Sequence, residues 1–188
     1  LGLSDTTDRS SPVQVGTGNN WIELSVGGYH TLLLNSNGTL SAFGRNTEGQ
    51  LGIGSSGFIN GINSIGNLSN WAKISSGEFS SYAIQSNGTL WSWGRNNNGE
   101  LGSSNTTSRS SPVQVGTESY WAQIGGGGQY FLAIQSNGTL WSCGTGQFGL
   151  LGLSDTTNRS SLTQVGTESY WTKIFPSRNF VLALQSNG

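Results

Sequence analysis

A repeat of fifty residues is the feature that most restricts how this chain can fold. A Leu-Gly pair, a Trp and a Ser-Asn-Gly run each return at intervals of fifty residues, with no insertion or deletion. The sequence therefore divides into units 1–50, 51–100, 101–150 and the incomplete unit 151–188. A period of this length indicates an array of stacked supersecondary units. The recurring structural positions include Trp21, Trp71, Trp121 and Trp171, and also Gly44, Gly94 and Gly144.

The residues within each unit favour β-strands over paired helices. Apolar residues occur in short runs bounded by Gly, Asn and Ser, as is typical of strands between turns. In the first unit these runs predict strands near residues 12–15, 22–26, 30–35 and 39–43. Asn37-Gly38 separates the last two runs, and this dipeptide favours a hairpin with a type I′ turn. We expect the same turn at residues 87–88 and 137–138.

A unit of four strands cannot bury both of its faces alone. Such units must stack side by side around an axis, as the blades of a β-propeller do. We therefore predict an all-β fold, a propeller of four-stranded antiparallel blades that forms a partial ring of about 3.8 repeats. The recurring Trp is the expected filler, because burying an indole removes roughly 200 Å² from water.

The repeat resembles that of the regulator-of-chromosome-condensation family. The motif that carries the resemblance is Asn-Gly-Thr-Leu-Trp-Ser-Trp-Gly-Arg-Asn at residues 87–96, followed by Gly-Glu-Leu-Gly at 99–102. A similar run occupies residues 38–52, and the family's Gly-x-x-His is matched around Gly27 and His30. The resemblance implies a seven-bladed propeller of four-stranded blades. Later units depart from it, with Ser80, Tyr130 and Phe180 at the His30 position and Gly144-Thr145-Gly146 in place of Gly-Arg-Asn.

Both ends of the sequence fall inside the repeat motif. It opens on the Leu-Gly pair and closes on Asn187-Gly188, which reads as a hairpin turn without a returning strand. We expect a window of a longer array or one part of a multi-chain ring, with further repeats or another chain completing the propeller. An isolated arc would expose strand edges and apolar blade faces.

Residues suited to catalysis or to metal and cofactor binding are sparse. The chain has one His and one Cys, and no carboxylate pair recurs. It has neither the Cys and His spacing of a zinc site nor a phosphate-binding loop. We predict a protein that is not an enzyme and that has no cofactor and no metal site. His30 is interpreted as a structural residue and Cys143 as a buried thiol.

Charge and hydropathy exclude two further classes of partner. With 8 basic and 9 acidic residues, the formal net charge is −1. Binding to nucleic acid needs clustered Lys and Arg, and a membrane span needs a long apolar run. We therefore predict no nucleic-acid partner and no membrane insertion.

Low charge, the lack of Met and a richness in Ser, Thr, Asn and Gly favour an extracellular, cell-surface or virion protein, in which repeats build a fibre, a capsid decoration or an adhesin.

Exposed aromatic and Arg side chains are the best binding candidates, because such residues dominate interface hot spots. Two Tyr precede the repeated Trp, three Arg share one phase of the repeat, and two more Arg share another. The alternative is that all of them decorate solvated loops. The candidates are Tyr120 and Tyr170, then Arg9, Arg109 and Arg159, then Arg45 and Arg95.

These features predict a non-catalytic binding or structural scaffold whose loops meet a protein or glycan partner. One alternative, which the resemblance implies, is a regulator of the guanine-nucleotide-exchange type or a ubiquitin-ligase adaptor. The fixed spacing leaves no room for the wedge that such exchange factors insert. Another alternative is an exported inhibitor of a hydrolase, since some propellers of similar repeat block β-lactamases. The near identity of the units reflects either recent duplication or repeated presentation of one surface to a repetitive ligand.

Overall fold

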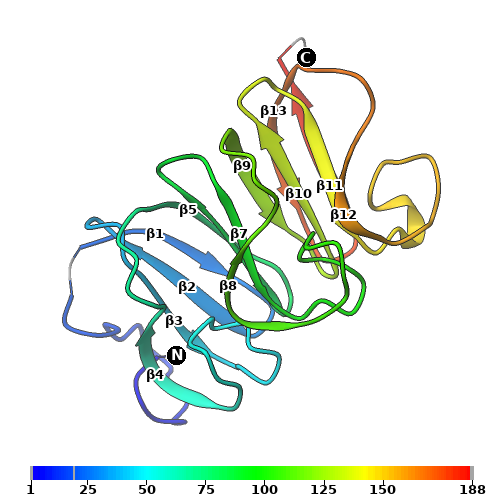
Figure 1. The fold of residues 1–188 in the computed structure, drawn as a ribbon. Coiled ribbons are helices and arrows are strands. Elements are labelled where there is room, and N and C mark those ends of the chain that lie inside the picture. The colour runs from blue at the N-terminus through cyan, green and yellow to red at the C-terminus, as the bar shows by residue number, and fades with distance from the viewer. Residues whose placement is uncertain (1, 19, 187–188) are drawn as a thin grey trace.

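The chain folds into four antiparallel β-sheets that stack side by side. The computed structural model describes residues 2–18 and 20–186. Over these residues three sheets have four strands and the last has two, and we call them blades 1 to 4 in chain order. Figure 1 shows them fanned into an open arc, which confirms the predicted partial propeller.

Each complete blade has the same order of strands, and its first strand begins at the repeated Trp. Blade 1 contains β1 (Trp21–Val26), β2 (His30–Asn35), β3 (Leu40–Gly44) and β4 (Ile59–Ser64). Blade 2 contains β5 (Trp71–Ser76), β6 (Ser80–Gln85), β7 (Leu90–Gly94) and β8 (Arg109–Gln114). Blade 3 contains β9 (Trp121–Gly126), β10 (Tyr130–Gln135), β11 (Leu140–Gly144) and β12 (Arg159–Gln164), and a 3₁₀ turn η1 (Gln147–Gly149) follows β11. Blade 4 contains β13 (Trp171–Pro176) and β14 (Val181–Gln185).

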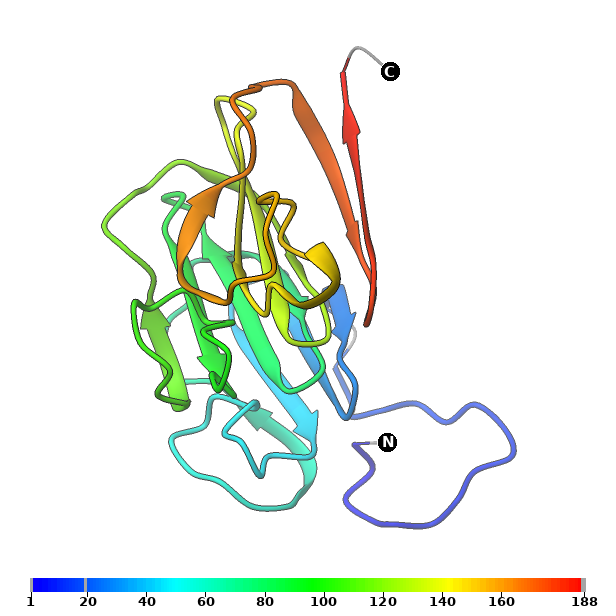
Figure 2. The ribbon, with the colours of Figure 1, turned by 90° about the vertical axis from the view of Figure 1, so that its right-hand side faces the viewer.

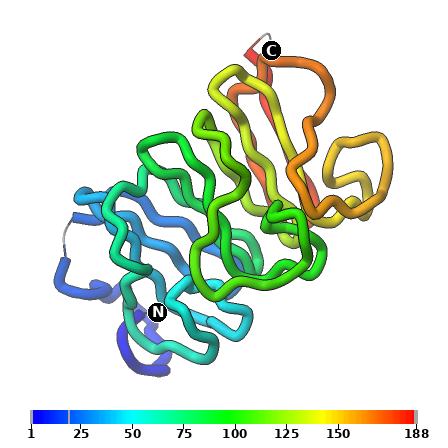
Figure 3. Tube along the Cα trace, in the orientation of Figure 1, coloured from blue at the N-terminus to red at the C-terminus, as the bar shows by residue number. Residues whose placement is uncertain are grey.

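Blades follow one another in space in the order in which they occur in the chain. First strands of neighbouring blades are in contact, from β1 to β5 to β9 to β13. The tube in Figure 3 passes from one blade to the next without crossing back over an earlier one. In the described ranges, none of the helical segments has the length and apolar character needed to cross a membrane.

The outermost strand of every complete blade comes from the following repeat. In blade 1, β3 belongs to the first repeat and β4 to the second, and the two pair antiparallel with Ser41 opposite Ser64. The same pairing joins β7 to β8 and β11 to β12. Each blade therefore crosses a boundary of the fifty-residue units, and this shared strand ties one repeat to the next.

The strand predicted at residues 12–15 is not formed, and that prediction was wrong. Residues 9–14 read Arg-Ser-Ser-Pro-Val-Gln, the same six residues that form β8 at 109–114. β8 forms because β7 offers an open edge, whereas no third strand of an earlier blade lies beside residues 9–14 in the described part of the chain. Figure 2 shows this blue segment as a loop at the side of the array. Backbone pairing thus decides the conformation of an identical sequence.

The predicted Asn-Gly hairpins are present, but their turn type differs from the prediction. Gly38 has φ of +77°, whereas Asn37 is not among the residues with positive φ, so the turn is not type I′. Asn35 N–H instead bonds to the Thr39 carbonyl across a loop of three residues, whose last member is left-handed. The Asn37 carboxamide oxygen accepts hydrogen bonds from the Thr39 N–H and hydroxyl, at 3.0 and 2.7 Å. The turn expected at Asn187-Gly188 lies outside the described residues.

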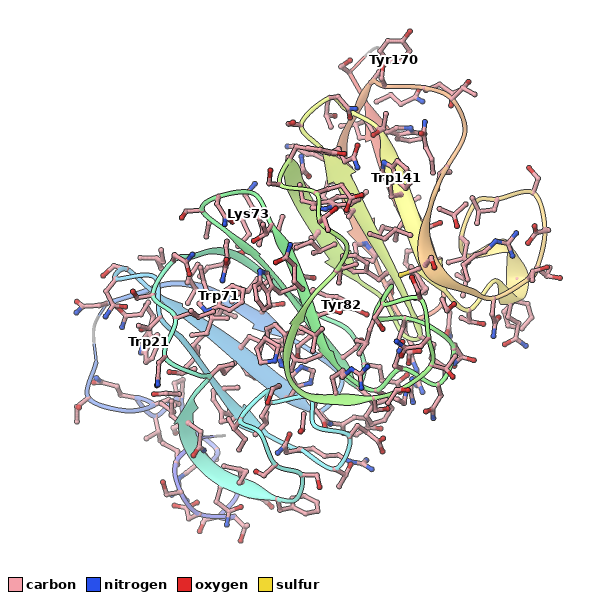
Figure 4. The ribbon with its side chains drawn as sticks, viewed as in Figure 1. Trp21, Trp71, Lys73, Tyr82, Trp141 and Tyr170 are labelled. Atoms are coloured by element: carbon pink, nitrogen blue, oxygen red, sulfur yellow. The ribbon has the colours of Figure 1, made fainter. Side chains whose placement is uncertain are left out.

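Three apolar clusters fill the spaces in and between the blades. The first contains Trp71 and Trp93 together with Leu32, Leu34 and other side chains of blade 1. Trp71 and Trp121 are buried, whereas Trp21 and Trp171, in the first and last blades, are only half-buried. Figure 4 shows Trp21 and Trp71 at matching places in successive blades. The repeated indole therefore packs most fully where a blade has neighbours on both sides.

Candidate functional site

The loops at one end of the blades gather the charged and aromatic residues that could meet a partner. We call this the loop end: it contains residues 27–29, 77–79, 127–129 and 177–179 after the first strands, and 45–50, 95–100 and 145–150 after the third. Backbone bonds of 2.9 Å from Arg45 N–H to the Tyr29 carbonyl, and from Arg95 N–H to that of Phe79, hold these loops together. The opposite end, the turn end, contains the hairpin turns at 36–38, 86–88 and 136–138.

Two motif residues give the loops after the third strands their shape. The side-chain oxygens of Asn46 and Asn96 accept hydrogen bonds from Leu51 N–H and Leu101 N–H, at 3.0 and 2.9 Å. Both Asn side chains are fully buried. The Asn of the Gly-Arg-Asn motif thus fixes the loop conformation and, with it, the position of the Arg that precedes this Asn. In blade 3, Gly146 replaces this Asn and the loop contains η1 instead.

Four of these loop residues form a cluster that bridges blades 1 and 2. The rings of Tyr29 and Phe79 stack with centroids 5.1 Å apart. The Arg45 guanidinium lies 5.4 and 5.2 Å from the two ring centroids, and the Arg95 guanidinium lies 4.4 Å from that of Phe79. Such cation–π contacts hold both the cation and the ring in place. We call Tyr29, Phe79, Arg45 and Arg95 the arginine–aromatic cluster.

A buried carboxylate fixes one side of this cluster. Glu100 is 1% exposed, and its Oε1 accepts a hydrogen bond from Arg95 Nε at 3.1 Å. Its Oε2 accepts another from Asn98 N–H at 2.8 Å. Burial raises the pKa of the Glu100 carboxyl, and these donors oppose that change. Arg95 is therefore anchored in the protein, whereas Tyr29 is 52% exposed and free to meet another molecule.

Beside the cluster, the inner ends of the blades enclose a concave site of about 440 Å³. Glycines of blades 1 to 3, among them Gly27, Gly77 and residues 126–128, form much of its lining. The Glu78 carboxylate and the Arg178 guanidinium pair across it at 2.8 Å and link blades 2 and 4. Arg178 is largely exposed, so this pair adds little to stability and mainly sets the charge of the rim.

The two ends differ in how closely the blades repeat one another. The residues after the first strands differ in each blade, since the four pairs are Gly28-Tyr29, Glu78-Phe79, Gly128-Gln129 and Arg178-Asn179. The turn end instead carries the run Ser-Asn-Gly in every repeat. A surface presented in identical copies would repeat its contact residues. The loop end is therefore the surface on which the blades of this arc differ from one another.

The structure separates the other candidate residues from this cluster. Tyr120 and Tyr170 are exposed at the turn end, where their carbonyls accept hydrogen bonds from Ser136 and Ser186 N–H. Figure 4 shows Tyr170 at the tip of the last blade. Each Tyr thus lies alone rather than in a cluster with Arg.

Of the three Arg that share the other phase of the repeat, Arg9 lies in the N-terminal loop, and Arg109 and Arg159 begin the outermost strands β8 and β12. Arg9 pairs with Asp5 at 2.7 Å and Arg159 with Asp155 at 2.6 Å, each with a carboxylate four residues earlier in the chain. Arg109 begins β8, opposite Gly94. Two of the three Arg thus form ion pairs with nearby Asp residues, as solvated surface residues commonly do.

The glycines at the ends of the third strands have a steric role. Gly44, Gly94 and Gly144 have φ between +100° and +109°. A Cβ at these positions would approach the carbonyl oxygens of Tyr29, Phe79 and Gln129 to 2.5–2.6 Å. Only glycine fits there, so these residues allow the two loops of each blade to meet.

His30 lies in a buried position with a polar partner. Its Nε2 is 2.8 Å from the Ser81 hydroxyl, which itself donates to the Gln50 carbonyl at 2.7 Å. With that hydroxyl proton used, Nε2 carries the hydrogen and Nδ1 is left unprotonated and without a partner among the described residues. Desolvation lowers the pKa of His30 to about 4. The neutral ring thus joins blades 1 and 2.

We expect the buried His30 to make the fold sensitive to acid. The unfolded chain takes up a proton on His30 near pH 6.5, whereas the folded chain does so only near pH 4. The contribution of His30 to the free energy of unfolding is therefore fully present above about pH 6.5. It is lost as the pH falls from about 6.5 to 4, by up to roughly 3 kcal/mol. Urea unfolding measured between pH 7 and pH 4 for the parent and for His30→Gln isolates this loss. A parallel decline in both proteins would contradict it.

Potential metal ligands do not gather in the part of the chain that the structure describes. Within residues 2–18 and 20–186, no group of three or more His, Cys, Asp or Glu side chains is placed to hold a metal ion. Cys143 is buried, and burial raises the pKa of its thiol far above the usual range.

The sequence indicated only half of the cluster. Arg45 and Arg95 stood out through their shared phase, whereas Tyr29, Phe79 and Glu100 were not singled out. A usable signal exists in the sequence. The third residue after the first strand is aromatic in the two repeats whose third strand is closed by Gly-Arg-Asn, whereas it is Gln129 in the third repeat, which has Gly-Thr-Gly instead.

Comparison with protein families assigns the repeat. A model of the regulator of chromosome condensation (RCC1) repeat matches residues 87–134, and a second model of this repeat matches residues 21–50 and 71–100. Together the matches cover half of the chain. No curated protein sequence matches it at a significant level.

Three solved structures with the same fold are each about twice as long as this chain. Human WBSCR16 matches with a TM-score of 0.86 at 19% identity, over 98% of this chain and 50% of its own. Prp20p from Saccharomyces cerevisiae, described with its binding properties to Gsp1p and histones, matches with 0.77 at 16% identity, over 89% and 45%. Yeast RCC1 (Prp20) bound to Kap60 gives 0.76 at 16%, over 89% and 43%. These likenesses establish the fold, and the chain spans about half the length of these structures.

Proposed function

The chain belongs to the regulator of chromosome condensation (RCC1) repeat family, and on that premise we propose that it is part of a non-catalytic propeller scaffold that binds a protein through its loop end. The observation that carries this proposal is the arginine–aromatic cluster. It presents an exposed Tyr29 that stacks on Phe79, with the Arg45 guanidinium over both rings.

Two physical features support a protein partner. Aromatic and Arg side chains provide most of the binding energy at protein interfaces, particularly when they are held rigid before binding. The loop end also differs from blade to blade, as suits a partner without repeats of its own. The similar yeast propeller is described with the protein partners Gsp1p, histones and Kap60. The names of the matching proteins mention neither a glycan ligand nor a virion.

The test is a binding titration of the purified chain against Gsp1p, histones and Kap60 as protein probes. For a probe that binds, Tyr29→Ala and Arg45→Gln are each expected to raise Kd at least about tenfold, which corresponds to about 1.4 kcal/mol. Tyr120→Ala and Tyr170→Ala, at the turn end, serve as matched controls and should leave Kd unchanged. The opposite pattern, with loss only in the two controls, would contradict the proposed face.

A further inference from the structure

Blade 4 exposes an apolar face that is covered in every other blade. Phe175, Phe180, Leu182 and Leu184 are between 46 and 63% exposed. The residues equivalent to Leu182 in blades 1 to 3 are Leu32, Tyr82 and Leu132, and each of these is almost fully buried. This surface, which we call the C-terminal face, thus continues the stacking interface already present three times in the molecule.

One pair of positions sets how closely two blades approach. At the junction of blades 1 and 2, Ser76 N–H donates to the Ser25 hydroxyl at 2.8 Å. At the next junction, Gly126 N–H donates to the Ser75 hydroxyl at 2.9 Å. At the third, a Cβ on Gly125 would lie 2.8 Å from Pro176 Cγ. The fifth residue of one first strand therefore faces the sixth residue of the next first strand at all three junctions.

At these two facing positions, at least one residue of each pair is small. The three pairs are Ser with Ser, Ser with Gly, and Gly with Pro, so no pair contains two residues larger than Ser. The space is strictly limited where one residue of the pair is large, because a Cβ on Gly125 would lie 2.8 Å from Pro176 Cγ and 2.9 Å from Pro176 Cδ. A large residue on one side of the junction therefore requires glycine on the other, as Pro176 and Gly125 illustrate.

The C-terminal face carries the largest residue found at this position. Phe175 takes the place of Ser25, Ser75 and Gly125, and by the same rule it must face glycine. The other end of the arc offers Val26, which is 68% exposed and whose equivalents are Ser76, Gly126 and Pro176. A second copy stacked head to tail would place Phe175 against Val26, two large side chains where no internal junction holds more than one.

We propose that the C-terminal face docks a further four-stranded blade of the same repeat class whose residue facing Phe175 is glycine, and that Val26 prevents a second copy of this chain from taking that place. The similar propellers are about twice as long as this chain, so blade stacking continues in them beyond an arc of this length. The size mismatch protects the ring from closing on the wrong partner, since head-to-tail contacts between copies produce rings or open filaments.

Sedimentation and cross-linking of the intact chain test this proposal. Val26→Gly creates the missing glycine on the first blade and is expected to strengthen head-to-tail association at least about tenfold over the parent. Phe175→Gly should strengthen it from the other side, with the Val26 side chain now facing glycine. A benzoylphenylalanine at position 175, which keeps the bulk of Phe175, should cross-link in the Val26→Gly background to residues 24–31 of a second copy.

Two results would overturn the proposal. One is association of the parent chain through these faces as tight as that of Val26→Gly, shown by the same cross-link. The other is the failure of both glycine variants to gain any association while they retain the thermal midpoint of the parent. Leu182→Glu in the Val26→Gly background is the control, because a charge on the C-terminal face should abolish the gain if that face makes the contact.

Discussion

Replacing Trp71 by alanine is expected to lower the free energy of unfolding by about 3–5 kcal/mol. Trp71 is 4% exposed in the cluster shared by blades 1 and 2. Its ring meets that of Trp91 edge-on, with centroids 5.7 Å apart, and lies 6.4 Å from that of Trp93. The substitution removes the largest part of this contact and leaves a cavity between two blades. Chemical denaturation measured by fluorescence or circular dichroism gives the loss directly.

Trp21→Ala is the matched control for that experiment. Trp21 holds the same position in blade 1, but it is only half-buried. Less apolar area is lost from the folded state, so the destabilisation should be clearly smaller than for Trp71→Ala. Equal losses for the two variants, or an unchanged midpoint for Trp71→Ala, would mean that packing between blades does not hold the indole in place.

Gly88→Ala is expected to lower the free energy of unfolding by roughly 2–5 kcal/mol. Gly88 has φ of +80°, a conformation that residues with a Cβ adopt only at a cost. A Cβ there would also lie 2.2 Å from the Ser119 carbonyl oxygen, so the chain leading into blade 3 would have to move. Thermal and urea unfolding of the variant report the combined effect.

Gly66→Ala separates the two causes. Gly66 also has positive φ, +58°, but a Cβ at this position meets no atom within 4 Å. Its substitution should therefore cost only the backbone term, about 1 kcal/mol. If Gly88→Ala proved no more harmful than Gly66→Ala, the close approach of the hairpin turn to the next blade would be refuted.

The sequence predicted the architecture well because its signals repeat. A fixed period, short apolar runs and the Asn-Gly dipeptides all indicate the same fold, and the structure confirms stacked antiparallel blades. The turn type was missed because it depends on loop length: three residues separate Asn35 from Thr39, so only Gly38 needs positive φ. The strand at 12–15 was predicted wrongly for another reason. A strand requires an open edge of another strand beside it as well as a suitable sequence.

The candidate site was less accessible to sequence reasoning. Arg45 and Arg95 could be singled out because both follow the glycine that ends a third strand. Their aromatic partners could not, because the stacking of Tyr29 on Phe79 depends on the distance and twist between two blades. The sequence likewise gives Tyr120 the same weight as Arg45, although they lie at opposite ends of the blades. Only the arrangement in space tells a cluster from isolated exposed residues.

The proposed binding function depends on the way the repeats interlock. Each repeat lends its outer strand to the blade before it, which fixes neighbouring blades in one register. That rigidity allows loops from different repeats to place a ring and a cation against each other at the loop end. A preorganised surface of this kind loses little entropy when a partner binds.

Backbone hydrogen exchange at two copies of one sequence tests the interlocked-blade account most directly. Residues 9–14 and 109–114 are both Arg-Ser-Ser-Pro-Val-Gln, and the flanking Asp8 and Ser108 distinguish their peptides. We expect the amides of 109–114, paired with β7, to exchange on the order of 100-fold more slowly than those of 9–14. Equal exchange at the two sites would contradict the claim that each blade is completed by a strand from the following repeat.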